Sequence, residues 1–85
     1  PRWDGKWRIV TFDIPESKKA ARDALRMRLT QIGMKEYQKS IFVSPYPCDK
    51  EIEFLVEFFD LRSHVRRILA ESLDNGLHYR QKFCI

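Results

Sequence analysis

The order in which strand-like and helix-like apolar patterns follow one another is the feature that most constrains how this chain can fold. Short runs of β-branched and aromatic residues alternate with two longer segments in which apolar residues recur every three or four positions, as they do in a helix. All of them fit into 85 residues. A chain of that length buries only roughly 60% of its unfolded surface, which suits one domain and not two. We therefore expect a single domain over residues 1–85, with strands and helices mixed along the chain.

The first strand is predicted at residues 6–14, which are rich in β-branched and aromatic side chains and are followed by Pro15. The first helix is predicted at residues 17–32. Ser17 can cap its start, and Gly33 can adopt the left-handed conformation that ends it. The apolar positions that define this helix are Ala21, Ala24, Leu25, Leu29 and Ile32.

Two short segments, residues 35–38 and 40–44, are predicted to pair as a hairpin that ends before Pro45 and Pro47. A second helix is predicted to begin at Asp49, which can act as its N-cap. The helix is identified by apolar residues at helical spacing, namely Ile52, Leu55, Val56 and Phe59, with Phe54 and Phe58 widening the apolar stripe.

The last third of the chain is ambiguous by periodicity alone. Residues 65–73 are compatible with a helix by propensity, but we predict a strand because the order then becomes βαββαβ. Residues 77–83 are either a short terminal helix or an added edge strand that pairs with a second copy, and we favour the helix.

Positive charge is concentrated in the first half of the chain. Residues 1–40 hold ten Lys or Arg against five acidic residues, whereas residues 41–85 hold six against seven. One face of the first helix carries a basic stripe that can contact the phosphates of DNA or RNA, or be a solvated surface on which Lys19 pairs with Asp23. The candidate phosphate-binding residues are Arg8, Lys18, Lys19, Arg22, Arg26 and Arg28.

Asp13 is the candidate catalytic and metal-binding residue. A carboxylate at the end of a buried apolar strand is costly unless it is hydrogen-bonded, ion-paired or bound to a metal. Two interpretations stay open. Asp13 either accepts backbone N–H groups at the start of the next helix, or two copies of Asp13 in a twofold dimer share one Mg²⁺ that activates water at a phosphodiester.

Other chemistries find no support. The three glycines are scattered, so there is no phosphate-binding loop. Cys48 and Cys84 lack the spacing of a metal or redox motif and are predicted to be reduced. His64 and His78 have no nucleophile placed beside them, and we expect them at the surface. The aromatic residues that could stack on bases, but that we expect in the core, are Trp3, Trp7, Tyr37 and Tyr46.

No apolar run approaches the ~18 residues that span a bilayer, and no signal peptide opens the chain. We therefore expect a cytoplasmic protein with no membrane partner. Because the first residue is Pro1 and not Met, the chain is predicted to be a fragment of a longer protein.

Three motifs carry a resemblance to a known family: VTFDI at residues 10–14, QIG at residues 31–33 and QKSIFV at residues 38–43. Together they resemble the Cas2 family of small CRISPR-associated proteins over most of residues 6–73. The resemblance implies an α+β, ferredoxin-like βαββαβ fold with an antiparallel sheet and two helices on one face. It also implies a symmetric homodimer and a metal-binding Asp13 at the end of the first strand.

A closer resemblance is to the central Cas2-like domain of PaaX-type transcriptional regulators. It rests on WDGKWR at residues 3–8, FDIPE at residues 12–16, ARD at residues 21–23 and the Ser44-Pro45 pair. Members of that family usually carry an N-terminal winged-helix domain before this one, which would explain a chain that starts at Pro1.

Three hypotheses follow from these resemblances and from the charge pattern. The first is a dimerisation and DNA-proximal module of a PaaX-like regulator. The second is a Mg²⁺-dependent CRISPR-associated endonuclease, or a subunit that binds DNA or RNA beside an integrase partner. The third is an oligomerisation or ligand-sensing domain without nucleic-acid contact. We favour the first, non-enzymatic role.

Overall fold

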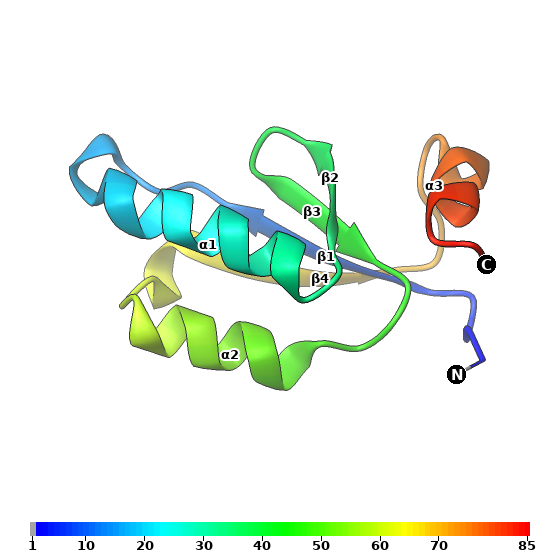
Figure 1. Cartoon of the computed structure of the whole chain (residues 1–85), viewed down its shortest axis with the longest axis horizontal. Coiled ribbons are helices and arrows are strands. Elements are labelled where there is room, and N and C mark those ends of the chain that lie inside the picture. Colours follow the sequence, from blue (N-terminus) through cyan, green and yellow to red (C-terminus); the bar gives the residue numbers. More distant parts are fainter. Residues whose placement is uncertain (1) are drawn as a thin grey trace.

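The computed structural model describes residues 2–85, and its elements follow the predicted order (Figure 1). Two short 3₁₀ turns, η1 (Glu16–Lys18) and η2 (Arg62–His64), precede α1 and β4. The helices and strands are β1 (Trp7–Phe12), α1 (Lys19–Gln31), β2 (Lys35–Gln38), β3 (Ile41–Ser44), α2 (Asp49–Phe58), β4 (Val65–Ala70) and α3 (Gly76–Lys82).

The four strands form one antiparallel sheet in the order β2-β3-β1-β4. β1 is central, because it pairs with β3 on one side and with β4 on the other. Helices α1 and α2 lie side by side over one face of the sheet, and the short α3 stands apart from them at the end of the molecule where the chain begins (Figure 1). The domain is therefore an α+β domain of the ferredoxin-like type, as predicted.

The larger core lies between the sheet and the two long helices. Val10 of β1 and Leu25 and Leu29 of α1 are completely buried in it, together with Leu61 from the segment after α2. Because alternate residues of a strand point to opposite faces, Val10 and Phe12 face this core while Trp7 faces away from it. Both faces of β1 are therefore covered at least in part.

The smaller core lies on the other face and depends on α3. Tyr79 of α3 packs with Trp7 and Val43, and its hydroxyl donates to the backbone carbonyl of Glu36 at 3.3 Å. Residues 77–82 are thus helical, as favoured, and the alternative of an edge strand was wrong. Of the four aromatic residues expected in the core, Trp7 is buried in this cluster and Trp3 and Tyr37 pack against it, whereas Tyr46 is half-buried and belongs to neither core.

Both predicted N-caps were wrong. Ser17 lies inside η1, and neither η1 nor α1 has a side-chain cap at its start. Asp49 is the first residue of α2, and its carboxylate pairs with Arg67 at 3.5 Å instead of capping the helix. Gly33, in contrast, has the expected positive φ of 101° after α1.

Three segments are shorter or more exposed than predicted. β1 ends at Phe12 and not at residue 14, and β4 ends at Ala70 and not at residue 73. Phe54 and Phe58 do not extend the buried stripe of α2, because they lie on its outer side and are mostly exposed.

The cysteines are both free, as expected. Cys48 is buried, and desolvation by burial raises the pKa of its thiol. Within residues 2–85, no helix is long and apolar enough to cross a membrane.

Candidate nucleic-acid interface around Asp13

Asp13 lies just beyond the end of β1, where its backbone is tied to the start of β4. Its N–H donates to the carbonyl oxygen of His64 at 2.9 Å, and the Nδ1 atom of His64 lies 3.1 Å from the carbonyl oxygen of Asp13. The carboxylate itself is exposed and forms no hydrogen bond or ion pair within the described residues. The interpretation in which Asp13 accepts N–H groups at the start of the next helix was wrong, because η1 begins only at Glu16 and has no side-chain cap.

A shallow pocket of about 360 Å³ opens beside Asp13, and it is defined here as the Asp13 pocket. Its charged and polar walls come from η1, α1 and the β2–β3 turn. The residues that line it are Phe12, Asp13, Ile14, Glu16, Arg22, Asp23, Arg26, Lys39 and Ser40.

The two arginines of the pocket are already paired with acids. Arg22 contacts Glu16 at 3.2 Å and donates to the carbonyl oxygen of Ile14 at 3.2 Å, whereas Arg26 contacts Glu36 at 3.1 Å. Exposed ion pairs of this kind contribute about 0–1 kcal/mol, so an incoming phosphate can replace the carboxylate at small cost. The ion pairs therefore reduce the affinity of these two arginines for a phosphate, but the arginines can still bind one.

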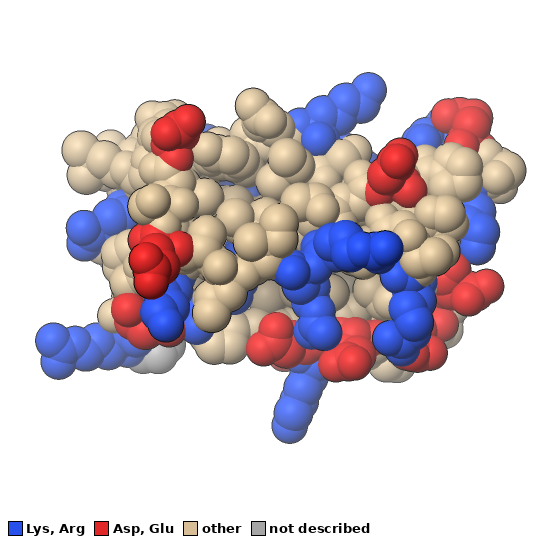
Figure 2. All heavy atoms as spheres, turned by 180° about the vertical axis from the view of Figure 1, so that it is seen from behind, with Lys and Arg blue, Asp and Glu red and all other residues tan. Residues whose placement is uncertain are grey.

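The two lysines of the predicted stripe also have partners. Lys19 pairs with Asp23 at 3.1 Å, one helical turn away, as the solvated-surface interpretation expected. Lys18 donates to the carbonyl oxygen of Asp60 at 3.1 Å, and this hydrogen bond joins η1 to the segment that follows α2. Figure 2, which shows the opposite side of the molecule from Figure 1, also has basic and acidic side chains next to one another.

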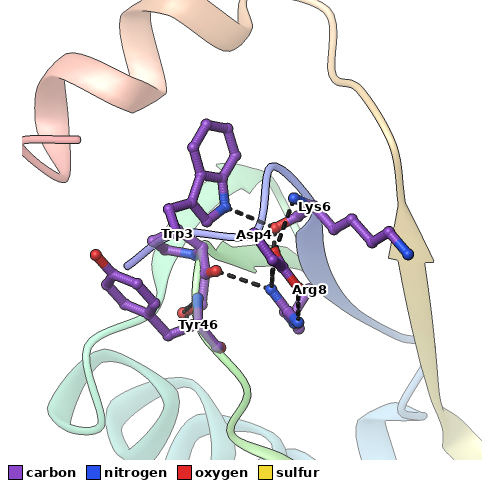
Figure 3. A network of polar contacts seen from close by, with 7 residues as sticks. Trp3, Asp4, Lys6, Arg8 and Tyr46 are labelled. Carbon is purple, nitrogen blue, oxygen red and sulfur yellow. Dashed lines mark hydrogen bonds and ion pairs between the residues drawn. The ribbon is translucent and has the colours of Figure 1, made fainter. Parts of the chain in front are cut away.

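Arg8 lies at the start of β1, away from the Asp13 pocket, in a network that organises the N-terminal segment (Figure 3). Its guanidinium binds both carboxylate oxygens of Asp4, at 2.7 and 2.9 Å, and donates to the carbonyl oxygen of Pro45 at 2.9 Å. The side chain is only 16% exposed. The Nε1 atom of Trp3 donates to the carbonyl oxygen of Lys6 at 2.8 Å in the same network. Arg8 therefore holds the N-terminal segment against the loop after β3.

Arg28 is the last residue of the predicted set, and it is also separate from the Asp13 pocket. It is exposed on α1 and lines a groove between α1 and α2. The structure thus brings together Asp13, Arg22 and Arg26, and leaves Arg8 and Arg28 at other places on the surface.

Two basic residues near Asp13 were missed by the sequence analysis. Lys39 lies in the β2–β3 turn and lines the Asp13 pocket, and Arg66 of β4 lies opposite Thr11 of β1. Neither contacts an acidic side chain in the part of the chain that the structure describes. Lys39 could have been found by aligning the predicted hairpin with the first strand, because the pairing of Thr11 with Ile41 brings the turn beside Asp13.

The donor set of one chain does not fit a Mg²⁺ site by itself. No group of three or more His, Cys, Asp or Glu side chains converges within residues 2–85. Of the acids beside Asp13, Glu16 is paired with Arg22 and Asp23 is paired with Lys19. Since Mg²⁺ prefers near-octahedral oxygen ligands, one free carboxylate leaves most positions to water, to phosphate or to a second copy.

The fold and the pocket define a class: a small ferredoxin-like domain with an exposed aspartate and several basic side chains at the end of its first strand. Comparison with family models identifies the family within this class. Residues 1–81 match the PaaX protein central Cas2-like domain, so the chain belongs to this family and is a PaaX-like regulator module. No curated protein matches the sequence.

The network around Arg8 gives a prediction about acid stability. The hydrogen bonds from Arg8, followed by that from the Lys6 N–H, lower the pKa of Asp4 to about 2. A carboxyl group whose pKa is lower in the folded than in the unfolded state stabilises the fold above its unfolded pKa of about 4, and this contribution disappears as the pH falls towards 2.

We therefore expect Asp4→Asn to lower the thermal midpoint at pH 6, and the difference from the unsubstituted chain to shrink between about pH 4 and pH 2. Thermal melts followed by circular dichroism across this range measure it. Asp74→Asn removes an exposed carboxylate that has no ion pair in the described residues and is the matched control. A difference that stays constant down to pH 2 would contradict the assigned role of Asp4.

Proposed function

We propose that this domain acts as the dimerisation and DNA-proximal module of a PaaX-like transcriptional regulator. Membership of the PaaX central Cas2-like family is the observation that carries the proposal. Two features of the surface support it: an edge strand with two exposed apolar residues that suit a second copy, and cations without acidic partners near Asp13 that suit phosphates.

The edge strand β4 supports dimerisation. β4 pairs with β1 along one side only, and its middle residues are open on both faces, with Ile68 47% and Leu69 60% exposed. Ile68 lies directly opposite Ile9 on the face of the sheet that α3 covers only at one end. Edge strands are usually protected by charge or by a partner. Arg66 and Arg67 carry charge on β4, and the apolar stretch that remains, Ile68 and Leu69, is suited to cover by a second copy.

We expect the chain to dimerise through this face, and Ile68→Lys to weaken the dimer by roughly tenfold or more, since about 1.5 kcal/mol of apolar burial is removed and a charge is added. Sedimentation equilibrium measures the dissociation constant. Leu77→Lys changes an equally apolar and 70% exposed residue on α3 and should leave it unchanged. A chain that stays monomeric at high concentration would refute the dimer.

The cations near Asp13 support contact with nucleic acid. Lys39 and Arg66 carry charges that no acid neutralises within the described chain, and the paired Arg22 and Arg26 lie in the same pocket as Lys39. A DNA backbone that passes over the end of β1 could therefore contact Lys39, Arg22 and Arg26 in the pocket and Arg66 on the other face of the sheet. Phosphate contacts of this kind carry no base specificity, which fits a module that lies close to DNA without reading it.

Charge reversal at Lys39 and Arg66 tests this interface, because neither change leaves an acidic partner unpaired. We expect Lys39→Glu with Arg66→Glu to weaken binding to labelled duplex DNA and to reduce the slope of log K against log salt by about 0.9 for each phosphate that the variant no longer binds. Fluorescence anisotropy at several salt concentrations measures both quantities. Arg80→Glu with Lys82→Glu, an equal charge change on α3, is the control, and an equal weakening there would argue against a specific surface.

The alternative function is a Mg²⁺-dependent nuclease. The observation that favours it is the exposed carboxylate of Asp13, which has no partner in residues 2–85 and is free to bind a metal. The observation against it is that one chain supplies a single free carboxylate, so the site depends on a twofold dimer that brings two copies of Asp13 together.

We expect no cleavage of labelled single-stranded RNA or duplex DNA by the purified chain with Mg²⁺ beyond that of the Asp13→Ala variant. A gel assay with and without a chelator distinguishes the two functions. Cleavage that disappears both with chelator and in Asp13→Ala would establish the nuclease instead. Cleavage that survives the substitution would indicate a contaminant.

A further inference from the structure

A groove separate from the Asp13 pocket runs between the C-terminal half of α1 and the length of α2. It has a volume of about 580 Å³ and is defined here as the α1–α2 groove. Its floor and walls are mainly apolar, and its rim carries both amide and charged groups. The residues that line it are Arg28, Gln31, Ile32, Lys50, Glu51, Phe54, Leu55, Phe58 and Phe59.

The most apolar wall of the groove is strongly exposed. Phe54 and Phe58 lie one helical turn apart on α2 and are 64% and 69% exposed. Their rings stack with centroids 5.8 Å apart and an interplanar angle of 19°, and Phe59 packs edge-on against Phe58 at 5.0 Å. Adjacent exposed aromatic rings beside a groove are typical of a binding surface and unusual on a solvated helix.

The charges of the groove differ from those of the rest of the helix layer. The other arginines and lysines of the two helices and of the turns η1 and η2 have acidic partners: Lys18, Lys19, Arg22, Arg26 and Arg62. Arg28 and Lys50 have none in the described part of the chain, and both line the groove. The one acid of the lining, Glu51, lies in the first turn of α2, where the positive end of the helix dipole offsets its charge.

We propose that the α1–α2 groove binds an amphipathic helix of another protein, with acidic residues flanking its apolar face. Its apolar side chains would cover Phe54 and Phe58, and its carboxylates would pair with Arg28 and Lys50. Helix-in-groove recognition uses apolar anchors at this one-turn spacing. The site goes beyond the proposed function, because it shares no lining residue with the Asp13 pocket and lies away from β4.

A helix fits the groove better than two other occupants. A small molecule in the groove would leave the outer sides of Phe54 and Phe58 in water, whereas a helix can cover both. A second copy of this chain would bring Arg28 and Lys50 of both protomers to one interface, and like charges facing each other are unfavourable. The unpaired cations therefore favour a partner of opposite charge.

The test uses two synthetic helical peptides of about 18 residues, or five turns, that share one Leu- and Phe-containing face. One has Glu on its flanks and the other has Lys. We expect the Glu peptide to bind the 85-residue chain roughly fivefold to thirtyfold more tightly, the effect of two exposed ion pairs. Amide chemical shifts in a ¹⁵N NMR titration should move in the C-terminal half of α1 and in α2.

Two variants make the test specific. Phe54→Ala with Phe58→Ala should abolish binding of the Glu peptide, while Leu77→Ala, an exposed apolar residue of α3, should not. Arg28→Glu with Lys50→Glu should reverse the preference so that the Lys peptide binds better, while Lys82→Glu should leave it unchanged. Thermal melts confirm that each variant is folded.

Three results would overturn the proposal. They are no binding of the Glu peptide, shifts centred on the sheet or on α3, or a preference that Arg28→Glu with Lys50→Glu fails to change. Self-association that disappears in the double Phe variant would also overturn it, because a second copy would then occupy the groove. None of these results depends on Lys39, Arg66 or Ile68, so failure here is distinguishable from failure of the proposed function.

Discussion

The burial of β1 on both of its faces is the constraint on which the rest of the structure depends. Val10 and Phe12 point into the core under α1 and α2, while Trp7 points into the smaller core that α3 closes. The side chains of β1 are buried alternately in the two cores. A shift of its register by one residue would move the apolar side chains of each core to the wrong face of the sheet. The neighbours of β1 are fixed in turn, with β3 on one side and β4 on the other. Phe12 is the last residue of β1 and still faces the core, so Asp13 leaves the sheet where the pairing with β4 ends, and its carboxylate stays in water and accessible to a ligand.

Periodicity predicted the elements well wherever one side of an element is buried. α1 shows this clearly, because Leu25 and Leu29 are fully buried at helical spacing and Gly33 ends the helix. β4 was ambiguous for a physical reason: its four middle residues, 66–69, are all exposed, so no alternation of burial marks the strand. There the order of elements, and not the local pattern, gave the correct prediction.

Side-chain partners were much harder to predict, because most of them join residues that are not one helical turn apart. The pair of Lys19 with Asp23 follows from helix geometry, but Arg22 reaches back to Glu16 in η1 and Arg26 crosses to Glu36 in β2. The basic stripe predicted from the sequence is thus largely neutralised by the fold. The cations left without an acidic partner near Asp13 are Lys39 and Arg66, which a search along one helix face could not reveal.

The cations of the domain differ in whether an acidic side chain of the same chain neutralises them. On the helix layer most cations serve the fold, since they tie α1 and α2 to neighbouring turns and strands. Among the cations without acidic partners in the described residues, Lys39 lines the Asp13 pocket and Arg28 and Lys50 line the α1–α2 groove, whereas Lys6, Lys35, Arg80 and Lys82 lie elsewhere. A charge left unpaired beside a pocket or an exposed aromatic pair can meet a ligand at a defined place, so it is better evidence of a partner than the net charge of the whole chain.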